Sequence, residues 1–288
     1  MDTKNNIINW FPGHMKKTFK EIKNNLKLVD MVLIILDARI PFSSMNFELL
    51  KSLNNKPVLI LLNKSSLADS SKNKIFIDFF KKKNLFTLNI DAKERNNINL
   101  IIPKIKQIIK NYTFKKKRIN NLLRIMITGV PNVGKSTLIN CLVKKKSTQT
   151  ADTPGVTKKL QWINLKDKIK LLDTPGVLYF KNLTIENGCS LSICGCIKDK
   201  MIPKEFVLNY FFSYLKKYYY ENLKNCFNLS DEELKQEDLL TLIINKNYNY
   251  QNNISNKNQI FTMIIKKIKS GKIKKVNFDL NLYKKMIK

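Results

Sequence analysis

The stretch 129–137, GVPNVGKST, narrows the choice of fold more than any other part of this sequence. It fits the pattern GxxxxGK[ST]. It stands between an apolar run at 122–130, which predicts a strand, and a helix expected from about Lys135. In that setting Gly129 and Gly134 allow the loop to turn its backbone amides toward phosphate oxygens at the positive end of the helix. The chain is therefore expected to hold a nucleotide phosphate on an α/β sheet.

The residues of this loop have separate expected roles. Lys135 would neutralise the β and γ phosphates and so assist catalysis, and the Ser136 hydroxyl would ligate Mg²⁺. The remaining phosphate contacts are expected from four neighbouring positions: Asn132, Val133, Gly134 and Thr137.

The pentapeptide DTPGV occurs twice, at 152–156 and at 173–177. Only the second copy follows an apolar run, IKLL. Asp173 is therefore the candidate carboxylate that holds Mg²⁺ through water, and the Gly176 amide would sense the γ phosphate during catalysis. The first copy leads into Thr157, a candidate second Mg²⁺ ligand in the triphosphate state. A plain Pro-Gly turn is the alternative interpretation of the first copy.

Three further apolar runs precede the phosphate loop, at 31–38, 57–64 and 85–92. Nearly continuous apolar runs are typical of strands in a parallel sheet that is covered on both faces. Helices are predicted between them, including amphipathic segments at about 16–28 and 97–111. After the loop, LQWINL and KIKLLD predict a hairpin. The alternation predicts an α/β fold with a doubly wound, mostly parallel sheet.

Beyond about residue 182 the sequence changes to helical patterns rich in tyrosine and lysine. Helices are predicted for PKEFVLNYFFSYLKKYY, for SDEELKQEDLLTLII, which opens with Ser230 and Glu233 in capping-box spacing, and for QIFTMIIKKIKSG, which stops at Gly271. The asparagine-rich stretch 245–258 is predicted to be a loop, and KVNFDL a short extended segment. The basic faces of these helices suit the phosphates of structured RNA.

The formal net charge of +31 favours a polyanionic partner, first nucleic acid and second an anionic membrane surface. Arginine is scarce beside lysine, so codon bias in an AT-rich genome explains part of this charge. No apolar run approaches the roughly 20 residues that cross a bilayer, and an integral membrane protein is not expected. The five cysteines form no CxxC pair, which fits buried, reduced thiols in a cytosol-like compartment.

The stretch 60–67, ILLNKSSL, looks like a guanine-reading strand and loop of the form NKxD. Asn63 would join the strand to the phosphate loop, and Lys64 would lay its aliphatic stem along the purine, with Ser65 beside it. Ser66 stands where a carboxylate would accept two hydrogen bonds from guanine, and a serine accepts more weakly. Without compensation, base specificity should fall by roughly 10- to 100-fold.

Two nearby features could compensate for the serine. Asp69, three residues beyond Ser66, could turn toward the base, although simple solvation of Asp69 is the stronger interpretation. The stretch Asp91-Ala92-Lys93 could mark guanine through a backbone amide that donates to the base oxygen.

The order of these motifs, NKSS, IDAK, GVPNVGKST, PGVT and then DTPG, resembles that of the circularly permuted GTPases. The opening NWFPGHMKK and the later DARIPFSS are similar to the ribosome biogenesis GTPase A (RbgA, YlqF) family, whose relatives include mitochondrial ribosome-associated GTPases. The resemblance continues to LSICGCIKDKMIP and FTMIIKKIKSGKIKKVNF, and so covers essentially the whole chain. Permutation would account for a base reader that precedes the phosphate loop.

The resemblance implies a P-loop GTPase-type sheet in permuted order and a smaller, mainly α-helical C-terminal domain. The expected GTPase domain is 1–182, and the expected basic domain that binds RNA or the ribosome is 183–288. The first would comprise a base-recognition half at 1–112, a basic linker at 113–121 and a phosphate and magnesium half at 122–182.

The resemblance also implies a Mg²⁺-dependent enzyme that binds and hydrolyses GTP. The GTP form would dock on the rRNA of an immature large ribosomal subunit, with ribosomal proteins as further contacts, and hydrolysis would release it as a monomer. The compartment would be a bacterial cytoplasm or, alternatively, an organelle matrix. The alternative class is an RNA-binding scaffold that binds nucleotide with relaxed base specificity and hydrolyses it negligibly.

Two residues take candidate roles from the resemblance. His14, the only histidine, would orient the attacking water, because Val177 stands where many GTPases have a glutamine and cannot hydrogen-bond. His14 could instead cap or pack at the start of the 16–28 helix, or contact RNA. Asn132 resembles the loop asparagine of GTPases that use K⁺ near the phosphates, and its alternative role is structural.

Overall fold

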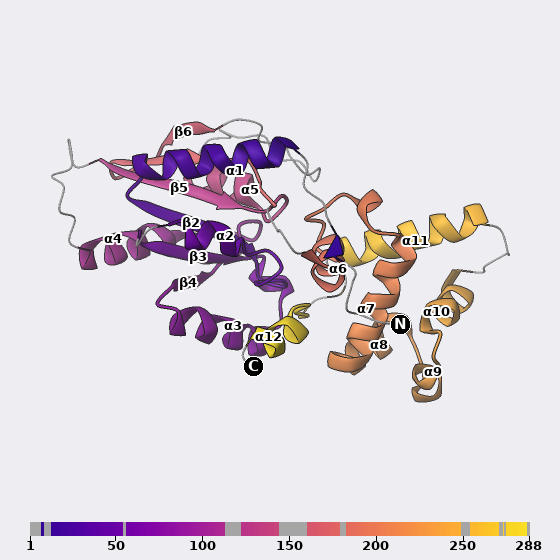
Figure 1. The fold of residues 1–288 in the computed structure, drawn as a ribbon. Coiled ribbons are helices and arrows are strands. Elements are labelled where there is room, and N and C mark those ends of the chain that lie inside the picture. The colour runs from indigo at the N-terminus through magenta and orange to yellow at the C-terminus, as the bar shows by residue number, and fades with distance from the viewer. Residues whose placement is uncertain are drawn as a thin grey trace.

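A six-stranded sheet of order β4-β3-β2-β5-β7-β6 lies at the centre of the first part of the chain (Figure 1). The computed structural model describes residues 7–8, 13–53, 56–112, 122–143, 160–178, 183–248, 254–270, 273 and 275–286. The strands are β2 (Met31–Asp37), β3 (Val58–Asn63), β4 (Phe86–Asn89), β5 (Leu123–Gly129), β6 (Gln161–Asn164) and β7 (Ile169–Asp173). This arrangement confirms the predicted α/β, mostly parallel sheet and places every predicted strand within it.

The central strands β2, β3 and β5 are apolar throughout most of their length because both faces of the sheet are covered. They run parallel to one another and to β4 and β7, whereas β6 pairs antiparallel with β7, as the predicted hairpin requires. In register, Asp37 lies opposite Asn63, and Ile127 lies opposite Asp173. The parallel strands therefore bring their carboxyl ends, and the polar residues that follow them, to one edge of the sheet.

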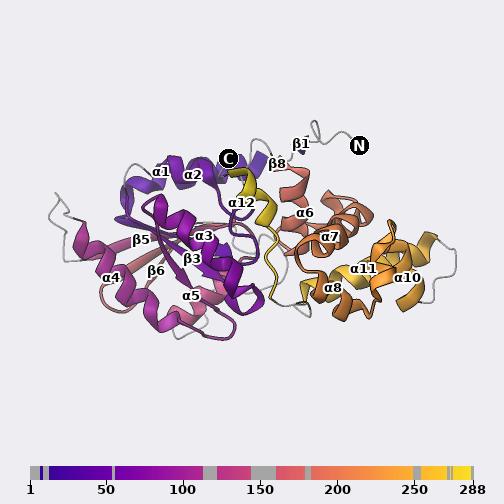
Figure 2. The ribbon, with the colours of Figure 1, turned by 90° about the horizontal axis from the view of Figure 1, so that it is seen from below.

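Helices cover the two faces of this sheet. They are α1 (Gly13–Asn25), α2 (Phe47–Lys51), α3 (Ser70–Lys82), α4 (Ile101–Asn111) and α5 (Lys135–Val143). Figure 2 shows α1 and α2 on one side of the strands and α4 and α5 on the other. The helix predicted at 16–28 begins three residues earlier, and its last part is a separate 3-10 turn, Leu26–Leu28.

Beyond residue 183 the chain forms a helical region beside the sheet (Figures 1 and 2). Its helices are α6 (Ile185–Ile193), α7 (Lys204–Tyr218), α8 (Tyr220–Phe227), α9 (Asp231–Lys235), α10 (Leu239–Tyr248) and α11 (Ile254–Lys269). The central helix is α7, which contacts α6, α8, α10 and α11 and buries Phe211 and Phe212 among them. The predicted capping box at Ser230 and Glu233 is present at the start of α9.

One helix prediction and one loop prediction in this region were wrong. The segment 230–244 is two helices, because Gln236 is extended and the Asp238 carboxylate accepts from the Thr241 amide, which caps a new helix. The loop predicted at 245–258 is occupied at both ends by α10 and α11, since buried apolar faces carry these helices into the asparagine-rich stretch. Gly271, the predicted helix stop, lies outside the described residues.

The chain then returns to the sheet through residues 275–279, which we call the return segment. Its backbone pairs with loops of the sheet domain, with the Lys275 amide donating to Leu67 O (2.8 Å) and the Phe278 amide to Arg39 O (2.7 Å). On the other side, the Tyr214 hydroxyl donates to Asn277 O (2.8 Å). The extended KVNFDL stretch therefore forms no strand, because its partners are loops and side chains.

A last helix, α12 (Leu280–Met286), follows the return segment and was not predicted. It lies beside α3 (Figures 1 and 2), and Tyr283 packs on Phe42 and Phe76 with ring centroids 6.2 and 5.8 Å apart. The chain thus leaves the sheet domain at about residue 183 and comes back to it at 275. The domain division at residue 182 stays a prediction.

A short two-stranded sheet joins the beginning of the chain to the start of the helical region. It pairs β1 (Ile7–Ile8) antiparallel with β8 (Leu183–Thr184). The segment that precedes NWFPGHM therefore runs beside the segment that follows DTPGVLYF. None of the described helices is both long and apolar enough to span a bilayer.

Candidate nucleotide-binding site

The phosphate loop connects β5 to α5 at the carboxyl edge of the sheet, in the strand–loop–helix order that the motif predicts. Gly134 has a φ of +94°, and a Cβ atom there would stand 2.3 Å from Asn63 Nδ2, so only glycine fits. Asn132 also takes a left-handed backbone, with a φ of 60°. The Val177 amide donates to Gly129 O (3.1 Å), which holds the DTPG segment against the loop.

Lys135 and Asp173 form a buried ion pair beneath this loop. Burial lowers the pKa of Lys135 and raises the pKa of Asp173, and the attraction between them offsets each shift only in part. Asp173 Oδ2 is buried and has no hydrogen-bond partner in the described part of the chain. A buried carboxylate oxygen without a partner is costly unless a cation or donor reaches it, so this position fits Mg²⁺.

The base-reading strand is tied directly to the phosphate loop. Asn63 Nδ2 donates to Val133 O (2.7 Å), and Asn63 Oδ1 accepts from the Ala92 amide (2.9 Å). Lys64 Nζ donates to Asn132 O (2.7 Å). One asparagine and one lysine therefore hold three segments together: the base-reading loop, the Asp91–Ala92 loop and the phosphate loop.

Ser66 is linked to the Asp91 carboxylate rather than to Asp69. Its hydroxyl donates to Asp91 Oδ2 (2.5 Å), while Asp91 Oδ1 accepts from the amides of Lys93 and Glu94, each at 3.1 Å. The Ser65 amide donates to Ile90 O (3.1 Å), which also fixes the two loops side by side.

Asp69 has a structural position. Its carboxylate caps α3 by accepting from the amides of Ser71 (2.9 Å) and Lys72 (3.2 Å). The structure thus gives this carboxylate a role that does not involve the base, and the suggestion that Asp69 replaces the missing aspartate finds no support in its contacts.

A second buried charge cluster, which sequence reasoning missed, lies at the end of β2. Arg39 binds both oxygens of Asp37 (2.9 and 2.7 Å), and Lys64 Nζ lies 3.0 Å from Asp37 Oδ2. Burial alone would raise the pKa of Asp37, but these two cations outweigh it and hold the pKa well below its usual range. The sequence signal for this cluster was an acidic and a basic residue, in the tripeptide DAR, directly after a fully apolar run.

The phosphate loop also touches the helical region. Asn132 Nδ2 donates to Gly195 O (2.9 Å), in the turn after α6. Gly195 has a φ of +74° and lies between two buried cysteines, Cys194 and Cys196. Burial raises the pKa of the Cys196 thiol to about 12, and the five cysteines are free thiols, as predicted.

The other predicted site residues differ in how much of them the structure describes. Val133, Ser136, Thr137 and Gly176 lie with Lys135 and Asp173 around the phosphate loop. His14 lies in the first turn of α1, but its side chain is not among those described. Thr157, the first DTPGV copy and the basic linker 113–121 lie outside the described residues.

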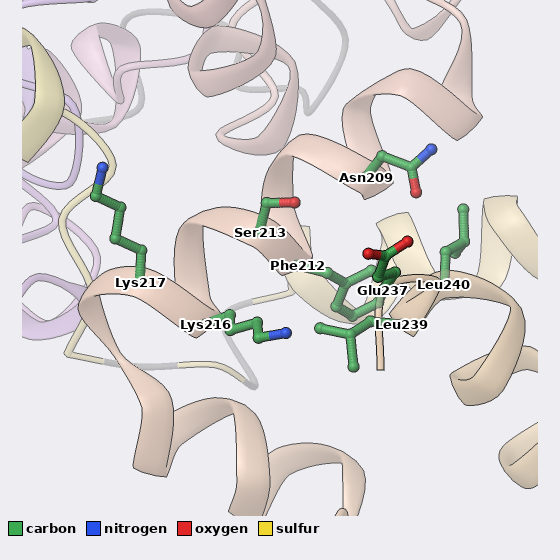
Figure 3. A pocket seen from close by; sticks show the side chains of 8 residues that line it. All are labelled: Asn209, Phe212, Ser213, Lys216, Lys217, Glu237, Leu239 and Leu240. Atoms are coloured by element: carbon green, nitrogen blue, oxygen red, sulfur yellow. The ribbon is translucent and has the colours of Figure 1, made fainter. Parts of the chain in front are cut away.

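A hollow of about 240 Å³ lies on the helical region, between α7 and the segment that leads into α10 (Figure 3). Its walls combine the cations of Lys216 and Lys217 with Glu237 and the apolar side chains of Phe212 and Leu240. Because none of its lining residues belongs to the nucleotide motifs, we assign no nucleotide site to it.

Comparison with known proteins points to one group of enzymes. A family model described as "50S ribosome-binding GTPase" matches residues 124–276. Ribosome biogenesis GTPase A of Bacillus licheniformis is 41% identical over 235 residues, which cover 80% of this chain and 82% of the relative. The Bacillus cereus protein of the same name is 35% identical over 281 residues, 95% of this chain and 94% of the relative. The chain belongs to the ribosome biogenesis GTPase A family.

Membership of this family makes the chain a GTP-hydrolysing enzyme with a role in ribosome assembly, and GTPases of this class usually use Mg²⁺. A mitochondrial ribosome-associated GTPase 1 from Ictalurus punctatus is also similar, at 36% identity over 71% of this chain and 67% of the relative. Among solved structures, GNP-bound YlqF from T. maritima matches with a TM-score of 0.58 at 24% identity, over 91% of this chain and 97% of that one. This last likeness supports the fold alone, and it confirms the predicted GTPase-type architecture.

Proposed function

We propose that the GTP form of this GTPase docks on rRNA of an immature large ribosomal subunit and that hydrolysis releases it. The supporting observation is the direct contact between phosphate loop and helical region, from Asn132 Nδ2 to Gly195 O. If the phosphate loop changes its contacts when the γ phosphate binds, the contact between Asn132 and Gly195 would change with it, and the helical region would move. The net charge of +31 supplies the attraction for RNA.

The residues of the site divide the work of hydrolysis. Lys135 neutralises charge on the β and γ phosphates, and the amides of the phosphate loop and Gly176 bind their oxygens. The Ser136 hydroxyl, Asp173 and Thr157 would hold Mg²⁺, and the Asp173 oxygen that has no hydrogen-bond partner among the described residues fits that role. When bound, Mg²⁺ neutralises the charge that develops on the phosphates.

His14 is the proposed group that orients the attacking water, because Val177 is apolar and buried. Its place at the start of α1, a few residues after the β1 strand that pairs with β8, puts its backbone on a segment linked to the DTPG side of the site. His14→Ala should lower ribosome-stimulated turnover by at least about tenfold with little change in nucleotide affinity. The matched control is Lys17→Ala, an exposed residue of the same helix.

The experiment that tests the whole proposal is GTP turnover with and without purified large subunits, together with cosedimentation in a non-hydrolysable GTP analogue or in GDP. We expect stimulated turnover, binding only in the analogue, and binding that weakens steeply with salt. Equal cosedimentation in both nucleotides, or an unstimulated rate, contradicts the proposal and favours an RNA-binding scaffold.

K⁺ is proposed as a further cation near the phosphates, held with the help of Asn132. Turnover should be faster in KCl than in NaCl at equal ionic strength, and Asn132→Ala should remove the difference. Equal rates in the two salts would leave Asn132 with the structural role that its contact with Gly195 already gives it.

A further inference from the structure

The base-reading loop of this chain carries a hydroxyl, and the carboxylate that it contacts comes from another loop. Ser66 is exposed, whereas Asp91 is only 2% exposed. The Ser66 hydroxyl donates to Asp91 Oδ2 at 2.5 Å. The other Asp91 oxygen is held by the amides of Lys93 and Glu94, so the carboxylate has a fixed position from which to orient the serine.

This contact decides what the serine can do toward a base. A hydroxyl has one proton and two acceptor lone pairs, and here the proton is used by Asp91. Ser66 Oγ is therefore left as an acceptor only, and the neighbouring negative charge strengthens it in that role. A serine without Asp91 could rotate and donate instead.

Guanine and adenine differ in this respect. The edge of guanine that NKxD loops read presents two donors, the N1 proton and the 2-amino group, whereas adenine presents an acceptor at N1. An oxygen fixed as an acceptor matches guanine and faces a lone pair on adenine. A rotatable hydroxyl would tolerate both bases, because it could donate to adenine N1.

We propose that Ser66 and Asp91 act as one guanine-reading unit, in which Ser66 Oγ contacts the base and Asp91 is a positioning residue that keeps it an acceptor. The inference rests on the proposed function, because it concerns the base specificity of the same site. Asn63 supports it, since it joins the Ala92 amide to the phosphate loop and so places both halves of the unit beside the nucleotide.

The test is the set of dissociation constants for GDP, IDP and ADP, measured by calorimetry on the full chain. IDP lacks the 2-amino group, and diphosphates avoid hydrolysis. Ser66→Ala should weaken GDP about tenfold or more, leave ADP binding unchanged or slightly tighter, and bring the GDP to IDP ratio close to one. Asp91→Asn should weaken GDP and tighten ADP, because the asparagine amide can donate to Ser66 and free its proton.

Ser71→Ala is the matched control, since the Ser71 hydroxyl also donates to a nearby aspartate, Asp69 (2.6 Å), but away from the base loop contact. Its nucleotide ratios should equal those of the unaltered chain. The double variant Ser66→Asp/Asp91→Ser exchanges the two groups and should return the GDP to ADP ratio to within about threefold of the original, whereas either single exchange should not.

Melting temperatures check that each variant is folded. Because Ser66 is exposed, the Ser66→Ala variant should fold and so still tests the proposal if Asp91→Asn is unstable. GDP to ADP ratios that stay unchanged in Ser66→Ala, or an unaltered chain that does not discriminate GDP from ADP, overturn the proposal. Turnover with and without large subunits is measured on the unaltered chain in parallel. Stimulated turnover with unchanged ratios rejects the guanine-reading unit alone, and lack of stimulation rejects the proposed function.

Discussion

Two buried ion pairs lie at the carboxyl edge of the same sheet, and they differ in how well their charges are satisfied. At the end of β2, Asp37 is held by two cations, Arg39 and Lys64. At the end of β7, Asp173 has one cation, Lys135, and one oxygen with no partner among the described residues. The pKa of Asp37 is lowered, whereas the pKa of Asp173 is raised.

The difference separates a charge cluster that is complete without a ligand from one that a ligand would complete. Around Asp37 the attraction of two cations exceeds the cost of burial, so the charged state is stable without any ligand. Around Asp173 burial exceeds the attraction of its partner, so the charges are held at a cost that a bound cation and phosphates would offset. Burial of a charge alone therefore does not distinguish the two kinds of site.

Asp37→Asn should give the largest loss of stability. It leaves the cations of Arg39 and Lys64 without their buried counter-charge, and we expect the free energy of unfolding in urea to fall by about 3–5 kcal/mol. Asp78→Asn, which changes an exposed carboxylate on α3, is the control and should shift it by under about 0.5 kcal/mol. A small effect of Asp37→Asn would remove the contrast between the two clusters.

Lys135→Met should act on turnover rather than on folding. Without the ammonium, GTP hydrolysis should fall by about 100-fold or more, because one preorganised charge at the phosphates is lost. In the nucleotide-free protein, the double variant Lys135→Met/Asp173→Asn should change the free energy of unfolding by under about 1 kcal/mol, since both ions of a buried pair are removed together. A large loss of stability would place this pair in the same class as the Asp37 cluster.

Asp279 is a third buried carboxylate, and its effect on stability should be smaller and should depend on pH. Burial raises its pKa from 3.8 to about 7, and the groups that donate to it, the amides of Phe42 and Ser43 and the Ser43 hydroxyl, are neutral. The folded protein then binds this proton more tightly than the unfolded chain does. The contribution of Asp279 to stability is therefore full below about pH 4 and is lost as the pH rises toward 7.

The measurement compares urea unfolding of the unaltered chain and of Asp279→Asn between about pH 5 and pH 7. The stability of the unaltered chain relative to the variant should fall by about 1–2 kcal/mol across this range. A difference that is constant with pH would mean that Asp279 is ionised throughout, as a fully satisfied carboxylate would be.

Much of the fold could be predicted because its signals are local. Continuous apolar runs located β2, β3 and β5, and the phosphate-loop pattern placed Gly134 where the structure requires a left-handed backbone. The carboxyl edge of a parallel sheet then brought Asn63 to the loop, as its motif implies. These features depend on residues that are close in sequence or on a rule of sheet topology.

The features that were missed depend on distant partners. The contact of Asn132 with Gly195 joins residues 63 positions apart, and the return segment reaches Arg39 across more than half of the chain. The serine at position 66 was evident, but its link to Asp91, 25 residues away, could not be read from either residue type. Sequence patterns identified the candidate site residues, but their hydrogen-bond partners depend on how distant loops pack together.

The contact of Asp279 with Ser43 spans 236 residues and has a consequence for how the chain folds. Closing a loop of this length carries an entropic cost, which makes contacts between distant residues slow to form. During synthesis the amides of Phe42 and Ser43 also emerge long before the Asp279 carboxylate that accepts from them. The sheet can form early from local contacts. The loop that holds Arg39, and Leu67 at the end of the base-reading stretch, can make these contacts only after the helical region has been synthesised. We therefore expect the base-reading loop to reach its final packing only after the synthesis of a segment that contributes no residue to it.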